Sequence, residues 1–138
     1  MAQRQDRAAD EFEMRIPAQA TELHRVRQAL ARWLDRRGAP SEVGAEVALA
    51  VHEAAANAVE HAYGPVDAAF DVEAFASPER EVCLIIRDQG RWRPPRGHNR
   101  GRGTLLMQEL MDHFEVNTSE EGTVVRMRRR VARAGAPV

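Results

Sequence analysis

Hydrophobic and polar residues alternate in several short stretches of the chain, which is the pattern of strands with one buried face. In EFEMRI, residues 11–16, every second side chain is apolar. Another stretch, EVCLIIRD at 81–88, is almost continuously apolar and is typical of a strand in the middle of a sheet. Five strands are predicted, at residues 11–16, 69–75, 81–88, 113–119 and 122–130.

Three other stretches repeat their apolar residues at the spacing of a helix. The first covers residues 18–37 and is stopped by Gly38-Ala-Pro40. The second begins at Ser41 and can run to Tyr63, before Gly64-Pro65. The third is predicted over residues 104–112.

The order of these elements predicts the fold class. Alternating strands leave one face of the sheet apolar, and the three helices are needed to cover that face. We therefore expect an α/β two-layer sandwich, with a mixed, mainly antiparallel sheet covered on one face by three helices. One domain is expected over residues 11–130, between a flexible N-terminus at 1–10 and a flexible tail at 131–138.

Charge and composition argue against several classes of function. The 20 basic residues balance 21 acidic ones, which argues against binding of a nucleic-acid backbone. No apolar stretch approaches the roughly 20 residues of a membrane-spanning helix. The single cysteine, Cys83, lies in the apolar run VCLII and is expected to be a buried, inert thiol. These features predict a cytoplasmic protein without direct contacts to nucleic acid or membranes.

The second predicted helix carries polar residues where its composition is otherwise apolar. Glu53 and Asn57 are four residues apart and therefore on one side of the helix, and residues 40–63 contain no lysine or arginine. A solvated face would explain the polar residues, but such a face normally carries basic residues as well. A carboxylate and a carboxamide one turn apart also suit Mg²⁺ completed by water and phosphate. The neighbouring polar positions are Glu46, Glu60 and His61.

Two further clusters have an ordinary and a functional interpretation. Asp88 ends the most apolar strand and Gly90 follows it, as in a common turn or as in the floor of a cleft where Asp88 accepts a hydrogen bond from a ligand amino group. Gly101 and Gly103 precede the third helix, beside Arg100. These glycines either give the loop flexibility or form an anion site at the start of the helix.

The order of these clusters resembles a known family. EAAANAVEHAYG, IIRDQG, GRGTLLMQELMD and EGTVVRMRRR resemble the N, G1 and G2 boxes and the final strand of the GHKL (Bergerat-fold) ATPases, over residues 11–130. Within that superfamily they look most like the bacterial anti-sigma factor serine/threonine kinases. One departure is Trp92, which replaces the second glycine of the usual D-x-G-x-G box.

The resemblance implies a role for each matching residue. Asn57 would ligate Mg²⁺, and Glu53 would be the general base that takes the proton from a serine or threonine hydroxyl. Asp88 would read the adenine amine. The other residues implied to bind ATP are Gly90, Arg100, Gly101, Gly103, Thr104 and Thr123.

The resemblance also implies partners. Such a kinase binds Mg-ATP, sequesters a sigma factor, and phosphorylates a STAS-domain anti-sigma antagonist on Ser or Thr; members often form homodimers, and the edge of the first strand is a candidate for pairing. The alternative is an ATP-binding regulatory module that binds its partners without phosphotransfer.

Overall fold

The structure is a computed structural model that describes residues 11–60, 69–77, 80–88, 102–120 and 122–131. The predicted N-terminal segment and most of the predicted tail lie outside these residues, as does the segment 89–101 with Trp92. None of the described helices is both long and apolar enough to cross a membrane.

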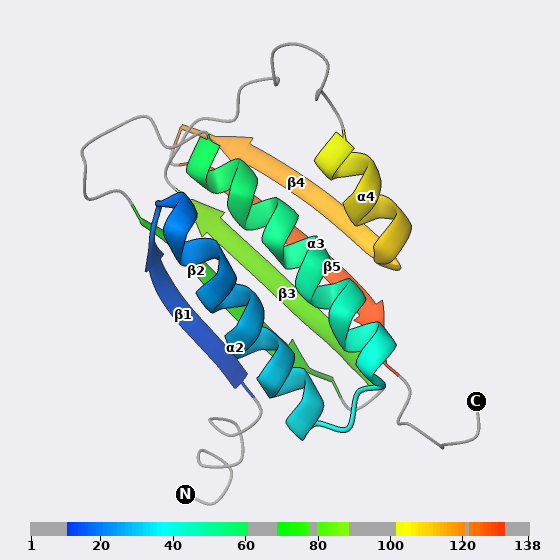
Figure 1. Cartoon of the computed structure of the whole chain (residues 1–138). Coiled ribbons are helices and arrows are strands. Elements are labelled where there is room, and N and C mark those ends of the chain that lie inside the picture. The colour runs from blue at the N-terminus through cyan, green and yellow to red at the C-terminus, as the bar shows by residue number, and fades with distance from the viewer. Residues whose placement is uncertain (1–10, 61–68, 78–79, 89–101, 121, 132–138) are drawn as a thin grey trace, which may run out of the picture.

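Five strands form a single sheet in the order β1-β2-β3-β5-β4 (Figure 1). Each described strand pairs with its neighbours in the antiparallel direction. The predicted antiparallel character is therefore confirmed, but the prediction of a mixed sheet is wrong for the described strands. The bounds agree with the predicted strands to within one residue: β1 is Glu11–Pro17, β2 Ala69–Ala76, β3 Glu81–Asp88, β4 His113–Ser119 and β5 Gly122–Arg130.

The helices differ from the prediction at their ends. The first predicted helix is divided into a short 3-10 turn, η1 (Ala20–Glu22), and α2 (Leu23–Arg36), and α3 covers Ser41–Glu60. Gly38 ends α2 with a φ of 78°, in the left-handed region that glycine adopts without strain, while its N–H bonds to the carbonyl of Asp35.

The last helix, α4 (Arg102–Leu110), begins and ends two residues earlier than predicted. Its end has a tertiary cause. The backbone N–H of Asp112 bonds to the carbonyl of Arg128 in β5, and a carboxylate oxygen of Asp112 accepts from the N–H of Arg130. These bonds attach the chain to the sheet directly after the helix.

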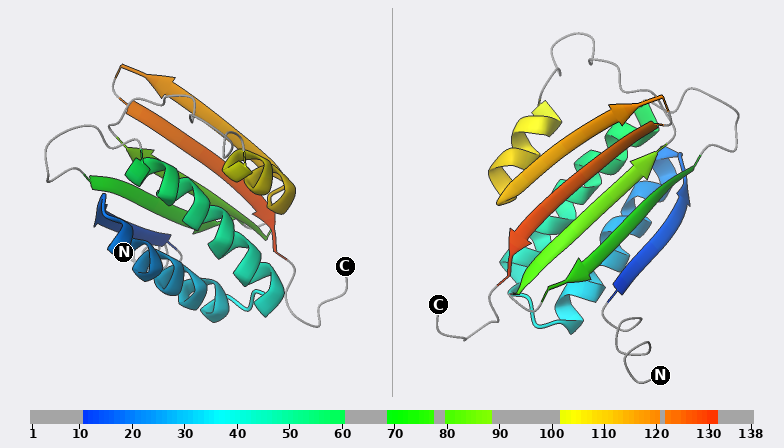
Figure 2. Two further views of the ribbon diagram at one scale, coloured as in Figure 1. Left: turned by 45° about the horizontal axis from the view of Figure 1, so that its top comes forward. Right: turned by 180° about the vertical axis from the view of Figure 1, so that it is seen from behind.

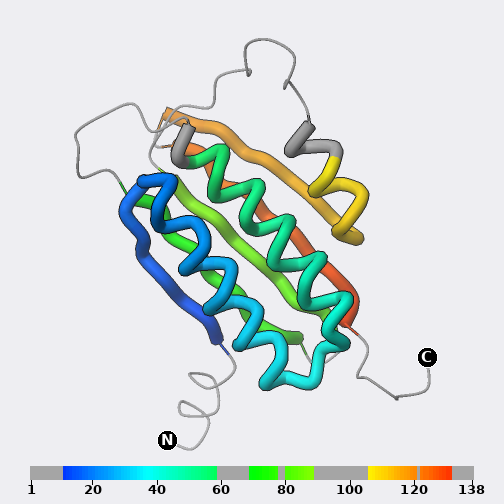
Figure 3. The backbone as a smooth tube through the Cα atoms, viewed as in Figure 1, coloured from blue at the N-terminus to red at the C-terminus, as the bar shows by residue number. Residues whose placement is uncertain are grey.

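All three helices cover the same face of the sheet, and α3 lies between α2 and α4 (Figures 1 and 2). Every second residue of β2 and β3 is buried beneath them, so the predicted alternation of the strands is confirmed. The backbone trace shows α3 running in the direction of β3, so that the C-terminal ends of both elements lie at the same end of the molecule (Figure 3). The largest fully buried side chains are Phe70, Ile16, Leu30, Leu34, Leu84, Ile86, Met107 and Met127.

Leu84, at the centre of this core, provides a test of the fold. We expect Leu84→Ala to lower the free energy of unfolding by about 2–5 kcal/mol, because the buried side chain leaves a cavity that its neighbours fill only in part. Leu23→Ala removes the same atoms from a half-buried position at the start of α2 and should cost clearly less. Urea unfolding of both variants measures the difference, and equal losses would contradict the assigned core.

Candidate functional site

Helix α3 has a wide buried side and a narrow polar flank. Val47, Val51, Ala54 and Ala58 are at most 2% exposed and pack in the core. Glu53 and Asn57 lie beside this stripe and are half-buried. The apolar stripe predicted for this helix also includes Val43. It is confirmed at the four buried positions, and Val43 is half-buried and packs against the core.

The contacts of Glu46 show which element lies next to the polar flank. Glu46 lies seven residues before Glu53 and so on the same side of the helix. A carboxylate oxygen of Glu46 is 2.8 Å from Nη2 of Arg129 in β5. Nη1 of Arg129 donates a hydrogen bond to the carbonyl of Leu110, the last residue of α4. The flank therefore faces α4, and Glu46 is bound by the protein itself.

The sequence pattern did not identify Arg129 as a residue of this region. Its two contacts connect α3, α4 and β5, and the guanidinium caps the carbonyl end of α4, where the helix dipole favours positive charge. The alternation of residues along β5 does indicate on which face of the sheet the side chain of Arg129 lies. Val125 and Met127 are buried under the helices, and Arg129 is the next residue of the same parity, whereas Arg128 is exposed.

Glu53 and Asn57 differ in their surroundings. Asn57 has an interaction partner within the protein. In the part of the chain that the structure describes, Glu53 has no hydrogen-bond or ion-pair partner, although its side chain is half-buried. A carboxylate in such a position is available to a hydroxyl or another donor that comes from outside the chain.

Asp88 and Thr123 form the floor at the same end of the molecule. They are direct partners across β3 and β5, which places their side chains on one face of the sheet. That face is the helix face, because Asp88 has the parity of the buried Leu84 and Ile86 and Thr123 is only 1% exposed. Both residues have interaction partners in the protein.

The remaining predicted site residues surround the first turn of α4. Gly103 was predicted to precede this helix, but it lies inside the first turn, as does Thr104, because the helix begins at Arg102. Helix α4 runs opposite to α3, which brings this turn towards the C-terminal half of α3 (Figure 1). Gly90, Arg100, Gly101 and His61 lie outside the described residues.

Cys83 is remote from this arrangement. It is half-buried and has the opposite parity to Leu84, so its side chain lies on the other face of the sheet. Burial raises the pKa of its thiol, the charge of Glu81 raises it further, and Arg128 partly opposes both effects. A raised pKa lowers the fraction of reactive thiolate. The prediction of a buried thiol is wrong, because Cys83 lies on the face of the sheet that the helices do not cover and is only half-buried.

The site thus lies at one end of the two-layer fold. The polar flank of α3, the first turn of α4, the last residue of β3 and the start of β5 come together there. Residues 16–129 match the model of the histidine kinase-like ATPase domain, and the chain belongs to that family. The predicted GHKL relationship is confirmed, and the family implies the use of ATP.

The relatives point to a particular branch of the family. The chain is 28% identical to the serine-protein kinase RsbW of Staphylococcus epidermidis, covering 86% of this chain and 85% of the relative. It is 29% identical to RsbW of Bacillus velezensis, covering 85% and 84%. The anti-sigma kinase branch is therefore the one that the similarity supports.

Solved structures share the fold. The RsbU and RsbW domains of a Mycobacterium tuberculosis protein align with a TM-score of 0.76 and 22% identity, covering 89% of this chain and 33% of that one. This chain thus spans about a third of the mycobacterial chain. The SiaB–SiaC complex of Pseudomonas aeruginosa aligns with a TM-score of 0.66 and 13% identity, covering 95% of each chain.

The contacts of Arg129 yield a prediction about α4. Arg129→Met should lower the free energy of unfolding by about 1–3 kcal/mol, because it leaves the Glu46 carboxylate and a helix-end carbonyl without their charged donor. Amide hydrogen exchange in α4 should accelerate more than in α2. Arg32→Met, at an exposed position of α2, is the control and should change stability by less than about 0.5 kcal/mol. Unchanged exchange in α4 would contradict the anchoring role.

Proposed function

We propose that the chain is a protein serine/threonine kinase of the anti-sigma type, which phosphorylates a STAS-domain antagonist and sequesters a sigma factor. The proposal is carried by Glu53, a half-buried carboxylate without a partner among the described residues, on the flank of α3 that faces α4. The names of the relatives, serine-protein kinases with 28–29% identity, support serine or threonine as the acceptor.

In this proposal Glu53 is the general base. Its carboxylate would accept the proton of the acceptor hydroxyl as the hydroxyl oxygen bonds to the γ-phosphorus and the bond between that phosphorus and the departing ADP breaks. The core packing of α3 would hold the carboxylate in place. Most of the remaining barrier in phosphoryl transfer is lowered by positioning and by neutralising charge. For that reason the base needs a neighbour that orients the phosphates.

Asn57 is the proposed neighbour. Its carboxamide lies one helical turn from Glu53 on the same flank, and an amide oxygen suits Mg²⁺, which keeps several water ligands and takes few from the protein. Bound Mg²⁺ would neutralise the charge of the ATP phosphates. The fit rests on the donor chemistry and on the half-buried position of both side chains.

The other site residues are proposed to hold the nucleotide. Asp88 and Thr123, paired on the helix face, would bind the adenine end. The first turn of α4 would direct its backbone N–H groups towards the phosphates. The residues proposed at the phosphate end are Arg100, Gly101, Gly103 and Thr104, and Gly90 belongs to the same box as Asp88.

The proposed partners are a sigma factor, a STAS-domain antagonist and a second copy of the chain, in the cytoplasm and without direct contact to nucleic acid or membranes. The SiaB–SiaC structure is a complex of a protein with this fold and a second protein, which agrees with partner binding. Release of sigma would follow binding of the unphosphorylated antagonist.

Glu53→Gln separates the kinase from the ATP-binding regulatory module. The variant should bind Mg-ATP as well as the wild type but transfer phosphate about 10²–10⁴ times more slowly, because it lacks the general base. Transfer of label from radioactive ATP to purified STAS-domain antagonists of the host measures the rate, and calorimetry measures ATP binding. Glu42→Gln, an exposed position of the same helix, is the matched control. Equal transfer by Glu53→Gln and the wild type would exclude this base.

Asn57→Ala tests the magnesium site. We expect it to weaken ATP binding in the presence of Mg²⁺ by more than about tenfold, or about 1.4 kcal/mol, and to leave metal-free binding little changed. Calorimetric titration of ATP with and without Mg²⁺ gives both values, while circular dichroism checks the fold. Asn117→Ala, at an exposed position of β4, is the control. Magnesium-dependent binding that survives Asn57→Ala would reject the assignment.

A further inference from the structure

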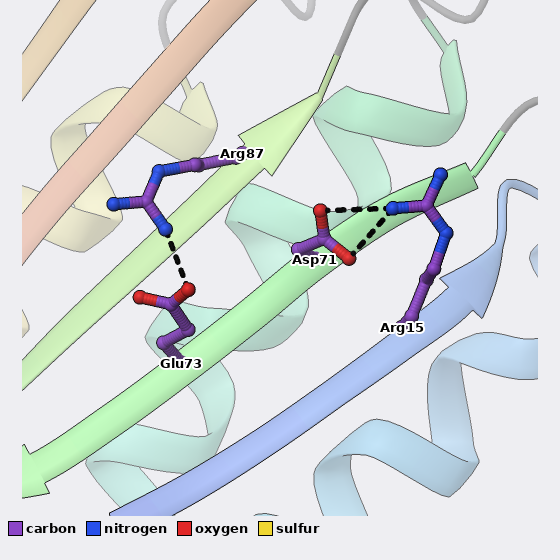
Figure 4. Close-up of polar contacts among 4 residues, drawn as sticks. All are labelled: Arg15, Asp71, Glu73 and Arg87. Atoms are coloured by element: carbon purple, nitrogen blue, oxygen red, sulfur yellow. Dashed lines mark hydrogen bonds and ion pairs between the residues drawn. The ribbon is translucent and has the colours of Figure 1, made fainter.

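Two arginines near the candidate site have carboxylate partners. On the face of the sheet that the helices do not cover, Nη1 of Arg15 is 3.2 Å from a carboxylate oxygen of Asp71, and Nη1 of Arg87 is 2.6 Å from one of Glu73 (Figure 4). Both pairs lie near the end of β3 that contributes Asp88, since Asp71 is the direct partner of Arg87 and of Arg15 across the strands. Arginines at the other end of the fold have different surroundings.

A cavity of about 710 Å³ lies at that other end, between the end of α2, the turn from β2 to β3 and the residue after β5. We call it the distal cavity. It adjoins Glu81, the first residue of β3, whereas Asp88 is the last, so that roughly 24 Å of strand separates it from the candidate site. Its volume falls in the range of roughly 300–1,000 Å³ that is typical of small-molecule sites.

The lining of the distal cavity combines an apolar wall with arginines. The apolar wall is formed by Leu34, Ala39, Val82 and Val131. The arginines are Arg36, Arg37 and Arg80, and Glu81 is the carboxylate among the described lining residues. Positive charge therefore predominates beside an apolar surface.

Two of these arginines keep their charge available. Arg36 and Arg80 are exposed, and in the part of the chain that the structure describes neither side chain has a hydrogen bond or an ion pair. The guanidinium of Arg37 differs, because it lies 4.6 Å from the centre of the Trp33 ring in a cation–π contact. An anion that enters the cavity would meet the guanidinium groups of Arg36 and Arg80.

The backbone at Arg80 is strained. Its φ is 63°, in the left-handed region that few side chains adopt and that glycine adopts without strain. The turn holds this conformation, because the N–H of Arg80 donates to the carbonyl of Ser77 and the carbonyl of Arg80 accepts from the N–H of Val131. Glycine would suit this backbone better than arginine does. The guanidinium in the cavity is a reason for arginine at this position that the fold does not provide.

We infer that the distal cavity binds a small organic oxyanion. Its carboxylate, phosphate or sulfonate group would bind Arg36 and Arg80, whose planar guanidinium groups suit oxyanions. Its apolar body would pack on the wall that includes Val82 and Val131. The inference goes beyond the proposed function and does not depend on it, because no residue of the candidate nucleotide site takes part.

The test uses 8-anilinonaphthalene-1-sulfonate, a fluorescent probe with an apolar ring system and one sulfonate, on the full-length chain. We expect Arg36→Gln and Arg80→Gly each to raise its dissociation constant by about fivefold or more, because each variant removes a charged donor. Arg32→Gln, at an exposed position of α2, is the control and should bind like the wild type. N-phenyl-1-naphthylamine has the same rings without the sulfonate, and neither cavity variant should change its binding.

Arg80→Gly also separates a binding role from a structural one. Because glycine relieves the strain of the turn, this variant should resist urea at least as well as the wild type while it binds the probe more weakly. A loss of stability equal to that of other surface substitutions with unchanged probe binding would assign Arg80 to the turn alone and overturn the inference.

The place of binding is measured by amide chemical shifts, which should change at Ala39 and Val82 when the probe is added. Phenyl phosphate and phenylacetate are then compared as competitors, and the stronger one identifies the preferred anionic group. Absence of probe binding, binding that both arginine variants leave unchanged, failure of both competitors, or displacement of the probe by Mg-ATP would each overturn the inference. Since the distal cavity and the candidate nucleotide site are separate, failure of one proposal leaves the other standing.

Discussion

The packing of α3 between two other helices and onto the centre of the sheet is the constraint on which the rest of the structure depends. Its small buried side chains, mostly alanine and valine, let the helix lie close to the strands beneath it. A narrow polar flank remains beside this buried side. Glu53 and Asn57 occupy that flank, so the same packing that stabilises the fold also fixes the two side chains proposed to perform the chemistry.

Much of the architecture follows from local patterns. Alternation predicts the strands because a side chain of a strand must choose one of two faces, and β2 and β3 show that choice directly. The C-terminal end of α4 could not be predicted in this way. It depends on Asp112 bonding to β5, a contact that exists only in the folded chain.

For the same reason, some residues of the candidate site could be predicted from the sequence, but their contacts with distant parts of the chain could not. Residue type and spacing single out Glu53, Asn57 and Asp88, and the fold brings their elements to one end of the molecule. Glu46 looked equivalent to Glu53 by spacing, but it is bound to Arg129, a partner 83 positions along the numbering away. Periodicity identifies the face of a helix; it does not identify what lies opposite.

The end of β3 has a consequence for how the two faces of the sheet communicate. Arg87 and Asp88 are consecutive residues whose side chains leave opposite faces, one to the ion pair with Glu73 and one to the floor of the candidate site. A ligand that displaces the backbone at Asp88 must displace Arg87 as well. Thermodynamic linkage makes such coupling reciprocal. If a ligand at the site changes the affinity for a partner that contacts Arg87, that partner changes the affinity for the ligand by the same factor.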